Sequence, residues 1–192
     1  MKPVVMYIHG FGSMYDKNSS KIRELSKIGT VLGMTIDYTK HPADIEDDIH
    51  AFAIENKVDM LVGTSMGGYF ANRVGSLHSI PFVMINPAIH PENTLMARVG
   101  KNRDYYGRDY HLEEQTVIAY ITRGMYSTGH GLLLVDEGDE LIDAAHTIEW
   151  LSPYFRYREF EGGSHRFEHM RDATANIDSH YVQSLCIGFG EN

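Results

Sequence analysis

A serine, a histidine and a group of acidic residues stand where they could act together in acyl transfer. Ser65 lies in Gly63-Thr64-Ser65-Met66-Gly67, a G-x-S-x-G pattern between an apolar run, residues 59–62, and a helical pattern, residues 69–77. This context predicts a nucleophile elbow, in which a sharp turn from strand to helix exposes the serine hydroxyl. The flanking glycines fit, because side chains there would clash where strand and helix approach each other. The alternative is a glycine-rich turn with an incidental serine.

A serine hydroxyl needs a base to become a nucleophile, and the base needs a group that orients it. His165 follows a Gly-Gly turn after the last strand-like run, where we expect a general base. An acidic loop follows the buried run 132–135. We assign Asp139 as the orienting carboxylate because it comes after the turn glycine, and Asp136 and Asp143 remain alternatives. Serine, then acid, then histidine is the chain order of doubly wound hydrolases.

The loop after the first apolar run predicts an oxyanion hole. Its sequence is His9-Gly10-Phe11-Gly12. Tetrahedral intermediates of acyl transfer need preorganised N–H donors aimed at the developing oxyanion. We assign one donor to the backbone N–H of Met66, which follows the serine, and the other to that of Phe11.

A rival motif overlaps residues 161–165, the loop that carries His165 and is called the histidine loop below. Residues 165–169 read H-x-x-E-H, the pattern of inverted zinc proteases. A zinc site would use both histidines from one helix face plus a distant carboxylate. The preceding Gly-Gly favours a loop at His165 instead, and the zinc interpretation leaves the elbow unexplained. We therefore expect no metal and no organic cofactor.

Composition restricts the partners and the location of the protein. The net charge is −9, and nucleic-acid binding needs a basic surface, so a nucleic-acid partner is not expected. No apolar run approaches the length of a membrane span, and the apolar run near the N-terminus is too short for a signal peptide. The sequence favours a cytoplasmic protein without a membrane partner, and it leaves the oligomeric state open.

Strand-length apolar runs alternate with helical patterns along the chain. Such alternation predicts a mostly parallel sheet of about six strands with helices on both faces, in a single domain over residues 1–192. The expected strands cover residues 4–8, 30–38, 59–62, 81–85, 132–135 and 154–160. Residues 88–130 break the rhythm, and this insertion is either a small lid or pocket wall, or a surface excursion with no role in binding. Within it, residues 116–122 fit a helix and a strand equally well.

Together these motifs resemble the small YqiA-like serine esterases of the α/β-hydrolase superfamily. The resemblance rests on His9-Gly10-Phe11, on residues 61–69, on Ile85-Asn86-Pro87-Ala88 and on the loops 138–143 and 161–167. It implies a compact α/β-hydrolase fold with Ser65, Asp139 and His165 as catalytic residues. It also implies hydrolysis of small-molecule carboxylic esters, with short acyl chains expected.

Two alternatives to a carboxylesterase share this fold. An acyl thioesterase or a peptidase would use the same triad on a different substrate. A catalytically silent α/β-hydrolase fold would act as a binding protein, although the intact serine, acid and histidine argue against it.

Overall fold

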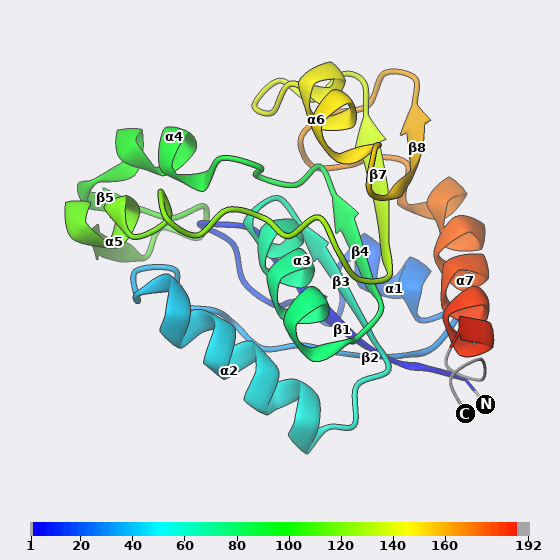
Figure 1. Cartoon of the computed structure of the whole chain (residues 1–192). Helices are drawn as coiled ribbons and strands as arrows, with labels where there is room; N and C mark the ends of the chain where they lie inside the picture. Colours follow the sequence, from blue (N-terminus) through cyan, green and yellow to red (C-terminus); the bar gives the residue numbers. More distant parts are fainter. Residues whose placement is uncertain (1, 188–192) are drawn as a thin grey trace.

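The centre of the molecule is a sheet of six strands in the order β2-β1-β3-β4-β7-β8, drawn as arrows in Figure 1. The computed structural model describes residues 2–187. Every neighbouring pair of these strands is parallel. Their bounds are Val4–Ile8 for β1, Thr30–Leu32 for β2, Met60–Thr64 for β3, Phe82–Ile85 for β4, Gly131–Asp136 for β7 and Arg156–Phe160 for β8. The predicted mostly parallel sheet of about six strands is confirmed.

Helices cover both faces of this sheet (Figure 1). On one face lie α1 (Ser20–Leu25) and α7 (Met170–Ile187), and on the other lie α2 (Pro42–Glu55), α3 (Met66–His78) and α6 (Ala144–Leu151). Successive side chains of a strand point to opposite faces. Val5 and Tyr7 of β1 therefore contact the first group, and Met6 and Ile8 contact the second. None of the helices within residues 2–187 combines the length and the apolar content needed to cross a membrane.

Local capping explains where two of these helices begin. Pro42 occupies the first turn of α2, and the ring of His41 accepts a hydrogen bond from the N–H of Ala43. Helix α6 begins at Ala144 because the Asp143 carboxylate caps it by accepting the N–H of His146 at 2.9 Å. The residues between β7 and α6 are thereby left free to form a loop.

The strand order places two loops at one point of the sheet. The chain runs outward from β1 to β2 and then returns across β1 to β3, so the order reverses between β1 and β3. In open α/β sheets, ligands bind outside the carboxyl ends of the strands at such a reversal. The loop after β1 and the turn after β3 both lie there, and they carry the predicted oxyanion loop and the predicted elbow.

Strand β2 is shorter than the sequence predicts. The β-branched and apolar residues of the run 30–38 favour a strand, but the ladder ends at Leu32. Beyond it, the N–H of Ile36 donates to Nε2 of His9 at 2.9 Å instead of to a neighbouring strand. The remainder of the run therefore serves as a loop beside the end of β1.

Residues 88–130 contain short helices and a strand pair that the sequence did not predict. The elements are α4 (Pro91–Leu95), the 3-10 helix η1 (Met96–Arg98), β5 (Gly100–Arg103), β6 (Asp109–Leu112) and α5 (Glu114–Ile118). β5 and β6 form an antiparallel hairpin. The undecided run 116–122 completes α5 and then turns. Leu112, Val117 and Tyr120 anchor the segment in the core. The single-domain assignment stays a prediction.

Candidate active site

Ser65 lies at the junction of β3 and α3 in a backbone conformation that few side chains adopt. Its φ is 58° and its ψ is −120°, which places a non-glycine residue at positive φ. Glycines on both sides make the turn feasible. A Cβ on Gly63 would lie 1.9 Å from the carbonyl oxygen of Gly67, and one on Gly67 would lie 2.0 Å from that of Ile8. The turn therefore has the geometry of the predicted elbow.

The three residues predicted for the triad lie within hydrogen-bond distance of one another. Nε2 of His165 is 2.9 Å from Oγ of Ser65, and Nδ1 is 2.8 and 3.0 Å from the two carboxylate oxygens of Asp139. Because an ionised carboxylate can only accept, Nδ1 of His165 carries the proton in this pair. Nε2 is then the unprotonated nitrogen, and it can accept the hydrogen of the serine hydroxyl.

The three candidate aspartates occupy different environments. Asp139, whose side chain is 2% exposed, faces His165 and also accepts the N–H groups of Leu141 and Ile142 at 2.9 and 2.8 Å. Asp143 caps α6. Asp136 lies on the other side of the loop that carries His165. Of the three aspartates, only Asp139 contacts the His165 ring among the described hydrogen bonds.

Asn86, at the end of β4, supports the histidine loop and was not predicted as a site residue. Its Nδ2 donates to the carbonyl oxygens of Ser164 and His165 at 3.0 and 3.3 Å. The N–H of His165 donates to Glu140, and this hydrogen bond lowers the pKa of the Glu140 carboxyl. The only sequence signal for Asn86 was its place in the Asn-Pro motif that contributed to the family resemblance.

The loop after β1 passes directly over the serine. A Cβ on Gly10 would lie 3.1 Å from Cβ of Ser65. Met66 is the first residue of α3, and the first N–H groups of a helix lack intrahelical acceptors. Within residues 2–187, the N–H of Phe11 donates to no protein acceptor. Neither predicted oxyanion donor is thus engaged by a protein acceptor among the described residues, and their role stays a prediction.

The side chain of His9 holds this loop in place, a task that the sequence did not reveal. His9 is buried, its Nε2 accepts the N–H of Ile36, and its Nδ1 lies 2.8 Å from the carbonyl oxygen of Gly10. Nδ1 must therefore carry the proton and Nε2 must lack it. Burial lowers the pKa of His9, which keeps the ring in this neutral form. Tyr38 also donates its hydroxyl to the carbonyl of His9.

A cavity of about 270 Å³ adjoins the loop after β1. Residues 11–13, residues 35–39 and the β5–β6 hairpin line it. The ring of Phe11 packs edge-on against Tyr110 of β6, with centroids 5.4 Å apart, and also contacts Tyr38. Ser65 is not among the lining residues. Part of the segment 88–130 therefore lines this cavity, and its role as a lid or substrate-pocket wall stays a prediction.

The zinc interpretation of residues 165–169 required a helix, and that requirement is not met. Helix α7 begins at Met170, so His165 and His169 both precede it. The ring of His165 faces Ser65 and Asp139, whereas Nδ1 of His169 faces Asp136 at 2.9 Å. Across residues 2–187, no group of three or more His, Cys, Asp or Glu side chains is placed to hold a metal ion.

Solved structures with the same architecture include hydrolases. Est1E from Butyrivibrio proteoclasticus superposes with a TM-score of 0.73 at 16% identity, covering 96% of this chain and 89% of Est1E. A further structure of Est1E has ferulic acid bound. The monoacylglycerol lipase of Paleococcus ferrophilus superposes with a TM-score of 0.71 at 16% identity, covering 95% of this chain and 96% of the lipase. The predicted α/β-hydrolase fold is therefore confirmed, and it is similar to that of esterases and lipases.

Sequence comparison identifies relatives over most of the chain. A UPF0227 protein of Shewanella sp. (strain MR-4) is 26% identical over 170 residues, which cover 85% of this chain and 91% of that protein. The model of one family matches residues 4–181. That match spans all eight strands, the elbow and the histidine loop. This chain therefore belongs to the uncharacterised protein family UPF0227.

Proposed function

We propose that this protein is a serine carboxylesterase that hydrolyses small-molecule esters, preferring short acyl chains. The observation that carries the proposal is the continuous hydrogen-bonded chain from Asp139 through His165 to Ser65, which ends at a serine in a strained elbow. The fold shared with esterases and lipases and the resemblance to YqiA-like serine esterases support the same reaction class. We further propose that the protein acts in the cytoplasm.

In the first half of the reaction, Ser65 becomes acylated. Oγ of Ser65 attacks the ester carbonyl carbon while Nε2 of His165 takes the hydroxyl proton. Asp139 fixes the tautomer of His165 and stabilises the imidazolium that forms. The N–H groups of Phe11 and Met66 donate to the oxyanion of the tetrahedral intermediate. The bond to the leaving alkoxide then breaks, and His165 gives that oxygen its proton, so the alcohol departs.

In the second half, water removes the acyl group. His165, neutral again, takes a proton from a water molecule that attacks the acyl carbon of the acyl-enzyme. The tetrahedral intermediate collapses, the proton returns to Oγ of Ser65, and the carboxylic acid leaves. One ester and one water thus give one acid and one alcohol, and the reaction draws on no metal or organic cofactor.

The cavity beside Phe11 supports a substrate with a small acyl group. Its volume of about 270 Å³ lies below the range of pockets that hold drug-sized ligands, roughly 300–1,000 Å³. Phe11, Tyr38 and Tyr110 give it aromatic walls. We therefore expect short acyl chains to react faster than long ones. Because Est1E has a structure with ferulic acid bound, an aromatic ester such as methyl ferulate belongs in the substrate panel.

Hydrolysis of p-nitrophenyl esters, from acetate to palmitate, tests the proposal. Wild type and the Ser65→Ala variant are compared, with thermal unfolding to show that both are folded. If Ser65 is the nucleophile, the variant loses on the order of 10⁶-fold in kcat. Ser179→Ala, at an exposed position of α7, is the matched serine control and should keep full activity. A fluorophosphonate should label wild type and not Ser65→Ala.

The alternatives give other results in the same experiment. Turnover of acyl thioesters or peptides with no turnover of esters would assign the same triad to a thioesterase or peptidase. A folded wild type that neither turns over any substrate nor reacts with the fluorophosphonate would contradict the esterase proposal. That result would favour a catalytically silent binding protein.

A further inference from the structure

The structure contains a second aspartate–histidine pair besides Asp139 and His165. Oδ1 of Asp136 is 2.9 Å from Nδ1 of His169, and Asp136 is the last residue of β7 and fully buried. His169 is the residue directly before α7. Because a carboxylate can only accept, Nδ1 of His169 is the donor in this pair. The proposed reaction uses neither side chain, so their arrangement needs a separate explanation.

The other oxygen of Asp136 binds the main chain on both sides of His165. Oδ2 accepts the N–H of Ser164 at 3.2 Å and that of Glu168 at 2.8 Å. The loop packs directly onto this carboxylate, since a Cβ on Gly163 would lie 2.0 Å from Oδ2. Asp136 therefore binds the main chain at both ends of the segment 164–168, which contains His165.

Asn86, on the neighbouring strand β4, also binds this segment and the main chain of Asp136. Its Oδ1 accepts the N–H of Asp136 at 2.9 Å, while its Nδ2 donates to the carbonyl oxygens of Ser164 and His165. The ends of β4 and β7 thus hold the histidine loop through one connected set of hydrogen bonds. The rigid sheet that carries the Ser65 elbow also carries these anchors, so the geometry of the loop is tied to that of the serine.

The ring of His169 has two contacts, the hydrogen bond to Asp136 and a stacking contact. It stacks on Phe160, the last residue of β8, with centroids 5.2 Å apart and planes 10° from parallel. Its side chain is partly exposed, at 27%. Cationic side chains near this region include Lys21 of α1, whose charge interacts with that of Asp136, and Arg158, whose guanidinium carbon lies 5.7 Å from the centroid of the Phe160 ring. Burial lowers the pKa of Lys21 to about 8, and the charge of Asp136 opposes that shift. A buried carboxylate needs hydrogen-bond donors, and His169 supplies its only side-chain donor among the described residues.

We propose that Asp136 and His169 form a positioning pair for His165. By fixing the main chain of residues 164–168, the pair keeps Nε2 of His165 within hydrogen-bond reach of Ser65. Neither residue touches the reacting atoms, so both act through His165. The catalytic part of this inference rests on the proposed function. A misplacement of about 1 Å in a catalytic group can cost roughly 100-fold in rate.

Two substitutions at one position separate positioning from packing. His169→Ala removes the donor to Asp136. His169→Asn keeps one, because the amide nitrogen of asparagine can occupy the position of Nδ1. With p-nitrophenyl acetate, His169→Ala should lower kcat about 10- to 100-fold and change KM by no more than about 3-fold. His169→Asn should restore kcat to within about 3-fold of wild type.

A matched control variant distinguishes a loss of positioning from a general loss of stability. Ile177→Val removes one methylene from the buried face of α7, about two helical turns beyond Met170. It should lower the midpoint of thermal unfolding while leaving kcat per folded molecule unchanged. If Ile177→Val and His169→Ala lower kcat equally at temperatures where both are folded, the effect of His169 is one of stability, and the proposal is overturned.

A spectroscopic measurement tests the inference independently of turnover. The proton on Nδ1 of His165, bonded to Asp139, should give a downfield ¹H resonance, assigned by its loss in His165→Gln. The resonance should persist in Ser65→Ala and His169→Asn, and it should broaden or disappear in His169→Ala. If wild type hydrolyses no ester, the proposed function fails but this resonance still reports on the loop. The proposal is overturned if His169→Ala keeps the wild-type resonance, or if His169→Asn loses it as His169→Ala does.

Discussion

The end of β7 and the loop after it carry three aspartates, and each binds a different partner. Asp139 contacts the ring of His165, Asp143 caps α6, and Asp136 binds the main chain around His165. These partners, rather than the acidity of the side chains, decide what each can do. The different partners of Asp139 and Asp143 lead to opposite predictions for asparagine at these two positions.

Asp139→Asn should lower kcat roughly 10⁴-fold, because the amide no longer stabilises the imidazolium and favours the wrong tautomer of His165. Asp143→Asn should leave both activity and stability near wild type, since asparagine caps a helix about as well as aspartate does. Steady-state kinetics and thermal unfolding of the two variants check both results. A greater loss in Asp143→Asn than in Asp139→Asn would contradict the assignment of the acid.

At the scale of single residues, the sequence indicated the serine and the histidine more firmly than the acid. Ser65 and His165 each stood in a distinctive glycine-rich context. The aspartates differ only in where their side chains point, and that depends on hydrogen bonds to residues far away in the chain, such as Ser164. The buried roles of His9 and Asn86 were missed for the same reason, because both act by binding loop backbone from a distance.

At the scale of elements, the elbow depends on the close approach of β3, α3 and the end of β1. Gly67 illustrates how little space remains, since a Cβ there would meet backbone oxygens of both Ile8 and His9 at 2.0 and 2.8 Å. Backbone atoms cannot move aside as the tip of a flexible side chain can. The glycines around Ser65 are therefore required by the packing of these elements and not only by the turn itself.

Gly67→Ala should destabilise the protein by about 3 kcal/mol or more, or prevent folding, because overpacking typically costs roughly 1–3 kcal/mol and this clash is with backbone atoms. Gly124→Ala is the matched control. No atom lies within 4 Å of a Cβ built on Gly124, and we expect a change between zero and about 1 kcal/mol of stabilisation. Urea unfolding of both variants checks this. An equal stability of the two variants would show that the elbow has more space than the structure indicates.

Buried elements could be predicted from the sequence more completely than exposed ones. Strands β1, β3, β4 and β7 are buried on both faces and appear in the sequence as apolar runs. The β5–β6 hairpin was missed because its strands have only four residues each, and Tyr110 and Leu112 are their only apolar side chains. β2 was predicted too long because hydrogen bonds to the loop after β1, rather than composition, end its ladder.

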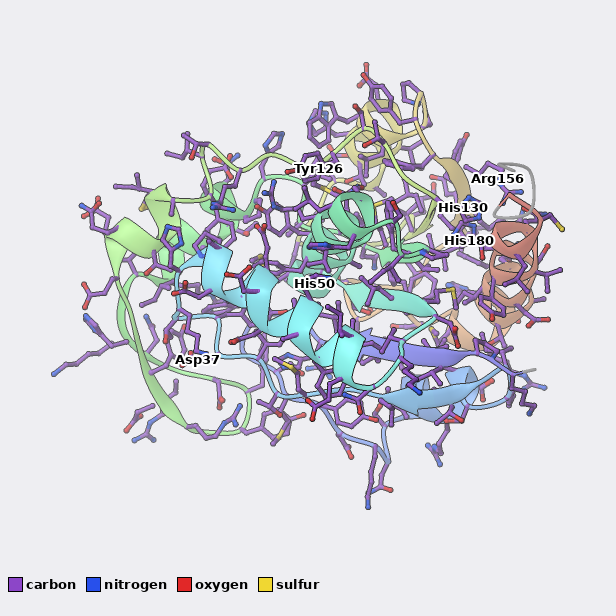
Figure 2. The ribbon with its side chains drawn as sticks, turned by 60° about the horizontal axis from the view of Figure 1, so that its bottom comes forward. Asp37, His50, Tyr126, His130, Arg156 and His180 are labelled. Atoms are coloured by element: carbon purple, nitrogen blue, oxygen red, sulfur yellow. The ribbon has the colours of Figure 1, made fainter. Side chains whose placement is uncertain are left out.

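At the scale of the whole molecule, α7 completes the fold by covering the second face of the sheet. Its residue His180 is buried against His130, which precedes β7, with the rings nearly parallel and 4.2 Å apart. Figure 2 shows these two histidines next to Arg156 of β8. Within residues 2–187, neither ring nitrogen of His180 has a hydrogen-bond partner. A proton on His180 would therefore introduce an unpaired charge into the packing between α7 and the sheet.

The protein should lose stability as the pH falls below about 6.5, in part because of His180. Burial, followed by the charges of His130 and Arg156, lowers the pKa of His180 from 6.5 to about 4 in the folded protein. Between these values the unfolded chain binds the proton and the folded protein does not, so acid favours unfolding. The contribution is fully present above pH 6.5 and is lost as the pH falls toward 4. At pH 5 the loss of stability relative to pH 7 should amount to roughly 2 kcal/mol.

His180→Phe tests this linkage, because phenylalanine keeps a flat ring against His130 and cannot take up a proton. Free energies of unfolding from urea titrations at pH 7 and pH 5 should fall less for this variant than for wild type, by about 2 kcal/mol. His146→Gln, at an exposed histidine of α6, should lose as much stability between the two pH values as wild type does. If His180→Phe also shows the full wild-type loss, other groups must account for the acid sensitivity, and the buried pair between α7 and the sheet contributes nothing to it.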